Sequence, residues 1–358
     1  MKVVFCWAEP SGYMAACWRA LAARPGVDVH IVLPQQLFDW QENRFGNELD
    51  GLSNELFSRK DPNIEAWLLE AVTRQKPDVV VVCGWIYWPY TRLVRAPALR
   101  DARMIMGMDS PWRATWTQRL ARFRLASTLR RCSVVVTAGE RSATYARQLG
   151  VPDKRIRSGY YGFDYNRFGR VAESRTATGW PRQFLFLGRY VAQKDLGTLV
   201  AAYERYRTLV SDPWGLTCCG DGSEGNLLAN HPGVVDIGFK PPGELPDVFR
   251  SHGAFVMASY FEPWGVAIAE AAASGLPLIC TTACGASVDL VRPYYNGVAA
   301  APRDVEGLAR AMQWIHEHES ELPAMGKRSH ALAEAFSAES WAARWHNYLL
   351  ESLEMSTE

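Results

Sequence analysis

The sequence predicts an α/β protein made of two Rossmann-like, doubly wound domains that face a central cleft. Short β-branched runs alternate with longer helical patterns, which is typical of βαβ units and parallel sheets. The alternation stops in a polar, arginine-rich stretch at residues 167–182 and then starts again. The 358 residues, of which 48% are hydrophobic, are enough for two separate cores.

The first predicted domain covers residues 1–168 and has five strand-like runs. They are VVFCW near residue 5, VDVHIVL near 30, PDVVVVCGW near 82, RMIMGM near 105 and CSVVVTAG near 135. The second covers residues 169–336, with the runs QFLFLGR, WGLTCCGDG, VVDIGF, AFVMASY and LPLICTT. Residues 337–358 follow as a serine-capped amphipathic helix, which we expect to pack back on the first domain.

Composition excludes several classes of protein. With 39 basic and 38 acidic residues the net charge is +1, so nothing in the overall charge favours a nucleic-acid partner. The eight cysteines include no Cys-x-x-Cys pair and lie mostly in apolar runs, as buried thiols in a reducing compartment do. No run reaches the roughly 18 apolar residues of a membrane span. We expect a cytoplasmic protein, at most peripheral to the inner face of a membrane.

The most informative stretch is SYFEPWGVAIAEAAASG at residues 259–275, in which seven residues separate Glu262 from Glu270. A helix starting at about Val266 would turn free backbone N–H groups and a positive dipole end toward a diphosphate. Glu270 lies about one turn into this apolar helix, where an unpaired carboxylate is costly. The two hydroxyls of a ribose would satisfy it, and a structural Arg or Lys is the alternative partner.

A second stretch, LFLGRYVAQKD, places two cations after a strand. Arg189 follows the strand directly and Lys194 comes five residues later. Because ligands of doubly wound sheets bind at the carboxyl ends of the strands, these cations are expected near the helix that starts at Val266. A diphosphate leaving group suits a guanidinium fork beside an ammonium point charge.

Together these residues resemble the retaining GT-B glycosyltransferases of glycosyltransferase family 4, whose mark is a Glu-x7-Glu element in the second domain. The resemblance covers most of the chain. It includes, in order, Gly162-Phe163-Asp164 with Phe168, Gly188-Arg189 with Lys194, Gly220-Asp221-Gly222, Gly238-Phe239, Glu262 to Glu270 followed by Ala-Ser-Gly-Leu-Pro, and Asn296-Gly297.

The resemblance implies a first domain for the acceptor and a second for a nucleoside diphosphate sugar. We expect no cofactor, and no metal because the two cations and the helix dipole would take the place of a divalent ion. It implies that Arg189 and Lys194 hold the donor phosphates, that Glu270 holds the ribose, and that Glu262 holds the hydroxyls of the transferred sugar. The remaining donor-binding positions it implies are Gly12, Gly188, Gly220, Phe239, Lys240, Trp264, Gly265 and Val266.

The chain departs from the family where many relatives place a histidine after the fourth strand of the first domain. Met108 stands there, and Asp109 follows as the candidate catalytic contact to donor or acceptor. His30, inside a strand, is expected to be a packed core side chain. The only close histidine pair is His316 with His318, on a helix expected to be exposed, so a metal site is not expected.

Three other functions remain open at this point. Residues 220–225 fit the Gly-x-Gly-x-x-Gly spacing of dinucleotide-binding enzymes, but only about ten residues precede the next strand, too few for a crossover helix. A sugar-nucleotide epimerase or a phosphorylase could use the same scaffold. A non-catalytic sugar-nucleotide-binding protein is the third possibility.

Residues 111–131, PWRATWTQRLARFRLASTLRR, carry six arginines and no acidic residue. On a helix, Trp112, Trp116, Leu120 and Phe123 would form one stripe with arginines beside it, a pattern typical of helices at a membrane interface. We expect this segment to contact an anionic membrane and bring the enzyme to a lipid-linked acceptor. The alternative is a basic surface helix whose aromatic side chains belong to the core or line the acceptor site.

Overall fold

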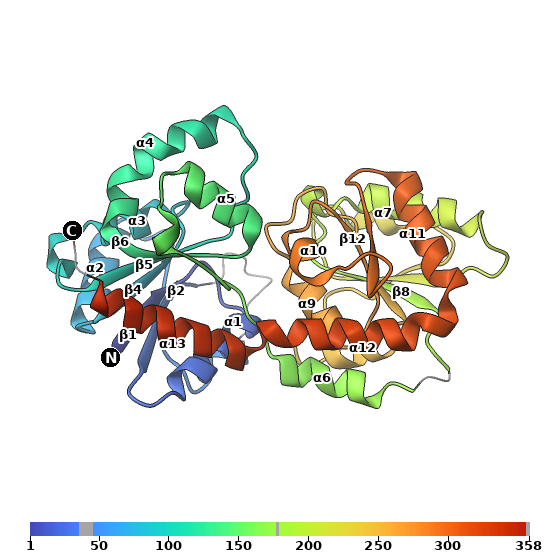
Figure 1. Cartoon of the computed structure of the whole chain (residues 1–358), viewed down its shortest axis with the longest axis horizontal. Coiled ribbons are helices and arrows are strands. Elements are labelled where there is room, and N and C mark those ends of the chain that lie inside the picture. Colours follow the sequence, from blue (N-terminus) through green and yellow to red (C-terminus); the bar gives the residue numbers. More distant parts are fainter. Residues whose placement is uncertain (36–45, 177–178, 356–358) are drawn as a thin grey trace. The chain divides into compact units, whose positions relative to one another are not determined.

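The computed structural model describes residues 1–35, 46–176 and 179–355, and it divides into two compact units (Figure 1). The first unit consists of Met1–Phe163 with Ala338–Glu358, and the second of Asp164–Ser337. Each unit is built around its own parallel sheet. The predicted fold class, two Rossmann-like α/β domains with parallel sheets, is confirmed.

The sheet of the first unit has seven strands in the order β3-β2-β1-β4-β5-β6-β7, all paired in parallel in the described residues. The strand order reverses between β1 and β4. The strands are β1 (Lys2–Cys6), β2 (Asp28–Pro34), β3 (Ser53–Phe57), β4 (Val79–Cys83), β5 (Arg103–Met108), β6 (Cys132–Thr137) and β7 (Ile156–Ser158).

Helices cover both faces of this sheet, because successive strand side chains point to opposite sides. The apolar faces of α2 to α5 share one buried core with Val4 and Val80. On the other face, Phe5 packs against Trp345 of α13 and Trp18 of α1. The helices are α1 (Gly12–Ala22), α2 (Ile64–Arg74), α3 (Trp88–Val94), α4 (Trp116–Arg131), α5 (Glu140–Gln148) and α13 (Ala338–Glu354), with short 3-10 turns at Gly46–Leu49, Pro97–Leu99 and Asp153–Arg155.

The last helix, α13, is distant in sequence from the sheet on which it packs. Its fully buried indoles Trp341 and Trp345 donate to the carbonyl oxygens of Tyr160 and Gly159 at 2.9 and 3.0 Å. Buried polar groups of this kind are costly unless paired, so these bonds fix the position of α13 as well as its burial. The chain end is thereby part of the first unit.

The sheet of the second unit has six strands in the order β10-β9-β8-β11-β12-β13, again parallel wherever described strands pair. The order reverses between β8 and β11, at the centre of the sheet. The strands are β8 (Gln183–Leu187), β9 (Gly215–Cys219), β10 (Val234–Asp236), β11 (Ala254–Met257), β12 (Leu278–Thr281) and β13 (Gly297–Ala300).

The helices of the second unit begin earlier than the sequence indicated. The stretch 167–182, expected to be a polar boundary, contains most of α6, whose first turn is capped by the Asp164 carboxylate accepting from the Arg167 N–H at 3.0 Å. The first segment of the first unit ends at Phe163, five residues before the predicted boundary at residue 168. The helices are α6 (Tyr165–Ser174), α7 (Leu196–Arg207), α8 (Leu245–Arg250), α9 (Val266–Ala273), α10 (Gly285–Leu290), α11 (Val305–Glu317) and α12 (Leu322–Ala333), with 3-10 turns at Ala192–Lys194, Gly225–Leu228, Glu319–Glu321 and Glu334–Phe336.

The ten predicted strands are all present, and three more had no sequence signal strong enough to find them. All three are edge strands: β3 (SNELF) and β7 (IRS) are mostly polar, and β13 (GVAA) is only four residues long and built of small side chains. Seven of the eight free cysteines are buried and Cys83 is partly buried, as the apolar context predicted. Within the described part of the chain, no helix is long and apolar enough to cross a bilayer.

Candidate functional site

The predicted donor-binding residues of the second unit gather at the carboxyl edge of its sheet, around the reversal between β8 and β11. Arg189 follows β8, and Glu262 lies beyond the end of β11. Such a reversal leaves a crevice at the carboxyl edge, because the two neighbouring connections leave toward opposite faces of the sheet. A ligand bound there would meet the loops that contain these residues.

Glycines bring the ends of β8 and β9 close together. The N–H of Gly188 donates to the carbonyl of Cys219 at 3.0 Å, and the N–H of Tyr190 donates to the carbonyl of Asp221 at 2.6 Å. A Cβ atom on Gly220 would overlap the Gly188 carbonyl oxygen. Larger residues would therefore push the two strand ends apart and displace Arg189.

Lys194 and Glu262, which follow β8 and β11, form an ion pair. Their side chains are only 11% and 12% exposed, so water screens the pair weakly. Sequence reasoning assigned the two residues to different parts of the donor, and the structure brings their charged groups into direct contact. Arg189, in contrast, is exposed.

The loop that contains Glu262 is held from behind by the start of α10. The N–H groups of Gly285 and Ala286 donate to the carbonyls of Glu262 and Trp264 at 3.0 and 2.8 Å, and the Trp264 indole donates to Asp289 at 3.1 Å. A Cβ on Gly285 would overlap the Pro263 carbonyl, so glycine is required there. These contacts fix the direction in which the loop enters α9.

Helix α9 begins at Val266, as predicted, after Gly265 with φ of 101°. This left-handed conformation is one that glycine adopts without strain. The first backbone N–H groups of a helix have no acceptor within the helix, and the helix dipole adds positive charge at this end. The amino end of α9 therefore offers donors beside the Lys194–Glu262 pair.

Glu270 lies in the middle of α9 and is partly buried. Burial raises the pKa of its carboxyl to about 7, an effect that Arg167 opposes and Asp164 reinforces. Arg167 is paired with Asp164 at 3.2 Å, and among the described residues no ion pair includes Glu270. The alternative of a structural Arg or Lys salt bridge to Glu270 is therefore absent from the described part of the chain.

Phe239 and Lys240, expected near the base of the donor, lie beside the end of β9, because the N–H of Gly220 donates to the carbonyl of Gly238 at 3.0 Å. Lys240 also approaches Glu244 at 3.5 Å. The connection from β9 to β10 contains only the 3-10 turn Gly225–Leu228. The helix that a dinucleotide-binding βαβ unit needs after its glycine motif is thus missing from this described connection.

In the first unit, Asp109 follows the carboxyl end of β5 and accepts a hydrogen bond from the Tyr161 hydroxyl at 2.9 Å. The Tyr161 ring meets the edge of Tyr13, with ring centroids 5.9 Å apart. Gly12, the first residue of α1, is next to Tyr13. Tyr13 belongs to the short loop that the sequence places near the diphosphate, whereas Tyr161, which connects this loop to Asp109, was not singled out from the sequence.

Further polar groups at the edge of the second sheet had no clear signal in the sequence. The Tyr190 hydroxyl donates to Asp236 at 2.7 Å, which links the ends of β8 and β10. The Ser259 hydroxyl follows β11, is fully buried, and has no hydrogen-bond partner among the described residues. Its position after an apolar strand is the only sequence feature that marks it.

Other predicted features lie away from these edges. His30 is buried in β2, as expected, with Nδ1 2.8 Å from the Ser53 hydroxyl. His316 is not on an open face, since its Nδ1 lies 2.8 Å from the Tyr206 hydroxyl. The described residues contain no group of three or more His, Cys, Asp and Glu side chains that could hold a metal ion.

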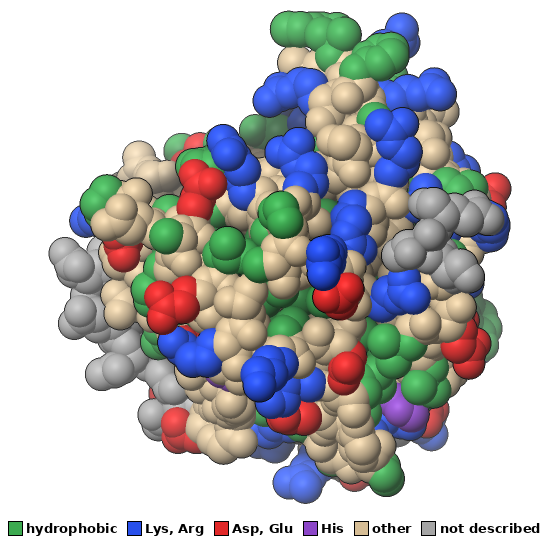
Figure 2. Space-filling model, turned by 90° about the vertical axis from the view of Figure 1, so that its left-hand side faces the viewer, with side chains coloured by type: hydrophobic (Ala, Val, Ile, Leu, Met, Phe, Trp, Pro, Cys, Tyr) green, Lys and Arg blue, Asp and Glu red, His purple; other side chains and the backbone are tan. Residues whose placement is uncertain are grey.

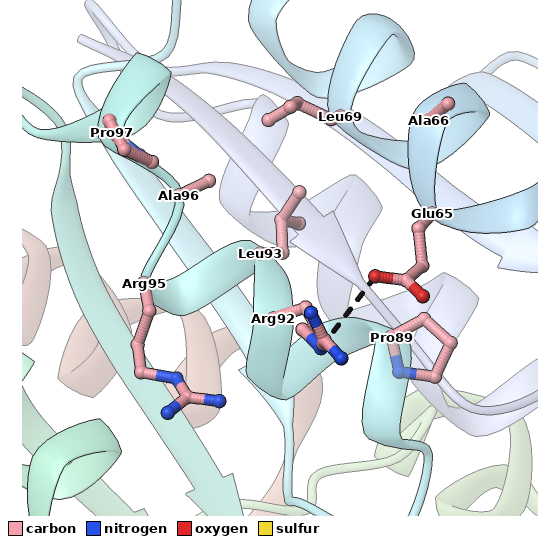
Figure 3. A pocket seen from close by; sticks show the side chains of 9 residues that line it. All are labelled: Glu65, Ala66, Leu69, Pro89, Arg92, Leu93, Arg95, Ala96 and Pro97. Carbon is pink, nitrogen blue, oxygen red and sulfur yellow. Dashed lines mark ion pairs between the residues drawn. The ribbon is translucent and has the colours of Figure 1, made fainter.

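A groove of about 510 Å³ lies between α2 and α3 of the first unit (Figure 3). Arg92 and Glu65 approach each other across it at 3.7 Å, and Leu69 and Leu93 form part of its apolar wall. None of the predicted site residues lines it. The groove belongs to the helical layer and not to the carboxyl edge of the sheet.

Family models match both units. The model described as "Glycosyl transferases group 1" matches residues 172–332, and the model described as "Glycosyl transferase 4-like domain" matches residues 10–162. A curated relative is a glycogen synthase of Mycobacterium tuberculosis, 32% identical over 161 residues. That alignment covers 43% of this chain and 38% of the synthase.

Solved structures of similar fold cover nearly the whole chain. Anabaena HepE, determined with UDP and glucose, has a TM-score of 0.76 at 18% identity, over 98% of this chain and 99% of its own. A sucrose-phosphate synthase of Thermosynechococcus elongatus has a TM-score of 0.74 at 17% identity, over 97% and 98%. At such identities the likeness is one of fold.

Proposed function

The chain is a GT-B protein of the glycosyltransferase family 4 type, and we propose that it transfers a sugar from a nucleoside diphosphate sugar to an acceptor hydroxyl. The observation that carries this proposal is the grouping of Arg189, the Lys194–Glu262 pair and the amino end of α9 at the reversal of the second sheet. Glu270, with its raised pKa, lies further along the same helix.

The chemistry of transfer explains why these groups suit the site. As the bond from the anomeric carbon to the diphosphate breaks, negative charge builds on the departing oxygen. Arg189, Lys194 and the N–H groups at the start of α9 would stabilise that charge where it develops, and fixed donors of this kind account for much of enzymatic rate enhancement. No metal and no cofactor enters this proposal.

The proposed contacts to the rest of the donor follow the resemblance. Glu270 would accept hydrogen bonds from the ribose hydroxyls and Glu262 from the hydroxyls of the transferred sugar. The backbone of residues 264–266 would contact the phosphates, and Phe239 with Lys240 would flank the base. Gly12 would approach the diphosphate from the first unit and Asp109 the donor or acceptor.

Retention of the anomeric configuration is proposed from the family resemblance. The acceptor is proposed to be a glycan, a lipid or a metabolite in glycoconjugate synthesis. HepE was determined with UDP-glucose as well as with UDP, so uridine diphosphate sugars are the first donors to test.

The test is a thermal-shift screen of the full chain against uridine, guanosine, adenosine and thymidine diphosphate sugars. A bound donor at 100 times its dissociation constant stabilises the protein by about 2.7 kcal/mol, a shift of several degrees in Tm. The expected result is a shift with one base, together with acceptor-dependent release of the free nucleoside diphosphate. Stabilisation by no sugar nucleotide would overturn the proposal, and binding without release would indicate a non-catalytic binding protein.

A further inference from the structure

The three most exposed large hydrophobic side chains in the described part of the chain all belong to the first unit. Ile86 is 85% exposed, Phe123 is 77% exposed and Trp116 is 72% exposed. Trp116 and Phe123 lie on α4, with half-exposed Leu120 between them. Apolar side chains gathered on one surface element mark a site of interaction, whereas singly scattered ones do not.

The exposed side chains of α4 form a stripe on its outer face. Trp116, Leu120 and Phe123 have the i, i+4, i+7 spacing that places side chains on one side of a helix. Leu125 and Leu129 lie on the opposite side and pack against the core. Since the inner face of α4 already supplies its packing, the outer stripe contributes nothing to the core of the unit.

One residue of the predicted stripe is not part of it. Trp112 precedes the helix, and its ring packs 5.5 Å from that of Tyr145 in the core. The helix begins only at Trp116, because the Thr115 hydroxyl accepts a hydrogen bond from the Gln118 N–H at 3.3 Å and caps it. The stripe is therefore shorter than predicted and begins at the capped end of α4.

Arginines flank the stripe on both sides. Arg119 and Arg130 lie on one side and Arg124 on the other, all three exposed, and α4 contains no acidic residue. None of the three takes part in an ion pair within the described chain. Arg131 has a structural role, since it donates to the carbonyls of residues 99, 100 and 102. Figure 2 shows the uppermost part of the molecule, where Figure 1 places α4, covered by hydrophobic and basic side chains.

A second exposed apolar segment lies next to α4. Trp85 and Trp112 pack on the same ring, that of Tyr145, with centroids 5.6 and 5.5 Å away. Ile86 follows Trp85, and half-exposed Trp88 begins α3, which contacts α4. The two loops leave the carboxyl ends of neighbouring strands, β4 and β5.

From these observations we propose that the outer face of α4, with the adjacent loop at residues 86–88, binds the surface of an anionic lipid bilayer. Tryptophan favours the headgroup region, leucine and phenylalanine enter its apolar boundary, and arginine binds anionic headgroups. A folded protein partner would need acidic groups to match the arginines and a groove to take the aromatic rings. An anionic bilayer supplies negative headgroups for the arginines and an apolar boundary for the rings.

The position of this surface bears on the acceptor. Its loops begin at the carboxyl edge of the first sheet, where Asp109 and Tyr161 also lie. If the proposed glycosyl transfer is correct, a lipid-linked acceptor would present its hydroxyl at this edge while its chain stays in the bilayer. This part rests on the proposed function, whereas the binding to lipid does not.

The test is co-sedimentation of the full chain with vesicles of phosphatidylcholine alone and with phosphatidylglycerol added. We expect binding to the anionic vesicles only, weakened by salt. Arg119→Ala/Arg124→Ala/Arg130→Ala should reduce binding by about fivefold for each arginine. The matched control is Arg170→Ala, another exposed arginine without an ion pair in the described chain.

The apolar part is tested by Trp116→Ser/Phe123→Ser, with Val235→Ser, half-exposed on β10, as control. Because these side chains are exposed, we expect unchanged Tm and unchanged sugar-nucleotide binding, and at least a tenfold loss of vesicle binding in the α4 variant alone. The proposal would be overturned by negligible binding to both kinds of vesicle or by equal binding to both. It would also be overturned if the protein self-associates without lipid and the α4 variant abolishes that association. If the protein binds a sugar nucleotide but no vesicles, the lipid proposal is refuted and the proposed transfer is not. If it binds anionic vesicles but no sugar nucleotide, the proposed transfer is refuted and the lipid proposal is not.

Discussion

At the scale of single residues, Glu270 is a partly buried carboxylate that forms no ion pair in the described part of the chain. Burial raises its pKa to about 7 from the model-peptide value of 4.5. Between pH 4.5 and about 7, the carboxyl is therefore protonated in the folded protein and ionised in the unfolded chain. The contribution of Glu270 to the free energy of unfolding falls as the pH rises through this range. A partly buried carboxylate without a partner is stabilised most by a ligand whose hydroxyl groups donate hydrogen bonds to it.

The first residue-scale prediction is that Glu270→Gln weakens donor binding by about 1 to 3 kcal/mol at pH 8, because a charged acceptor is lost. Wild-type affinity should also fall as the pH drops below about 7, where the carboxyl takes up a proton, while the variant stays constant. The unliganded variant should be the more stable protein at pH 8. Calorimetric titration at pH 6, 7 and 8 measures this, with exposed Glu173→Gln as control. A parallel pH dependence in both proteins would exclude Glu270 as the titrating group.

Lys194 and Arg189 differ in how deeply they are buried. Lys194 is nearly buried against Glu262, and removing one member of such a pair leaves the other charge uncompensated, at a cost of about 3 kcal/mol or more. Arg189 is exposed, so truncating it should change stability by no more than about 0.5 kcal/mol.

The second residue-scale prediction separates catalysis from stability at these two positions. Arg189→Ala should keep its Tm and lose about 100-fold to 1000-fold in turnover. Lys194→Ala should have both a lower Tm and a lower turnover. The double variant Lys194→Met/Glu262→Gln should regain the wild-type Tm but not the turnover. Thermal melts and initial rates measure this. Wild-type rates in Arg189→Ala, or a double variant as unstable as Lys194→Ala, would contradict the assignment.

At the scale of elements, α9 is a short helix, and we propose that its amino end balances the diphosphate charge that a divalent cation balances in metal-dependent transferases. Its start is fixed by Gly265 and by the hydrogen bonds from Gly285 and Ala286 to the preceding loop. A helix dipole held in place in this way needs no reorganisation as charge develops on the leaving group.

We therefore predict that transfer continues in excess EDTA at the rate measured without it. The control is the same assay with added Mg²⁺, which should change the rate little. Complete loss of activity in EDTA, restored by Mg²⁺ or Mn²⁺, would show that a cation and not α9 balances the diphosphate.

At the scale of the whole molecule, the two units share one topological feature, a reversal of strand order within a parallel sheet. Both sheets reverse their strand order once, between β1 and β4 and between β8 and β11. In the second unit Arg189 and Glu262 follow the two strands at the reversal, and in the first unit Gly12 follows β1 and Asp109 follows β5, one strand beyond the reversal. Helix α13 returns to the first sheet, so the first unit is made of two segments far apart in the sequence. The return of residues 337–358 to the first unit was expected from the sequence, whereas the order of the strands in each sheet was not predicted.

The sequence alone was sufficient for the number of sheets, their parallel strands and the start of α9. These depend on local signals, such as β-branched runs, the glycine before Val266 and the small apolar residues after it. The candidate site residues could be named for the same reason, since strand ends and helix starts have local signatures. Short edge strands such as β3 and β7 lack such signals and were missed.

The tertiary structure alone decided which of these residues meet. It paired Lys194 with Glu262, raised the pKa of Glu270 and left the outer face of α4 uncovered in the described chain. It also packed Trp112 against the core, outside the stripe in which the helical spacing had included it. The physical reason is that pairing, desolvation and exposure depend on neighbours distant in sequence, whereas propensity and periodicity depend only on residues a few positions away.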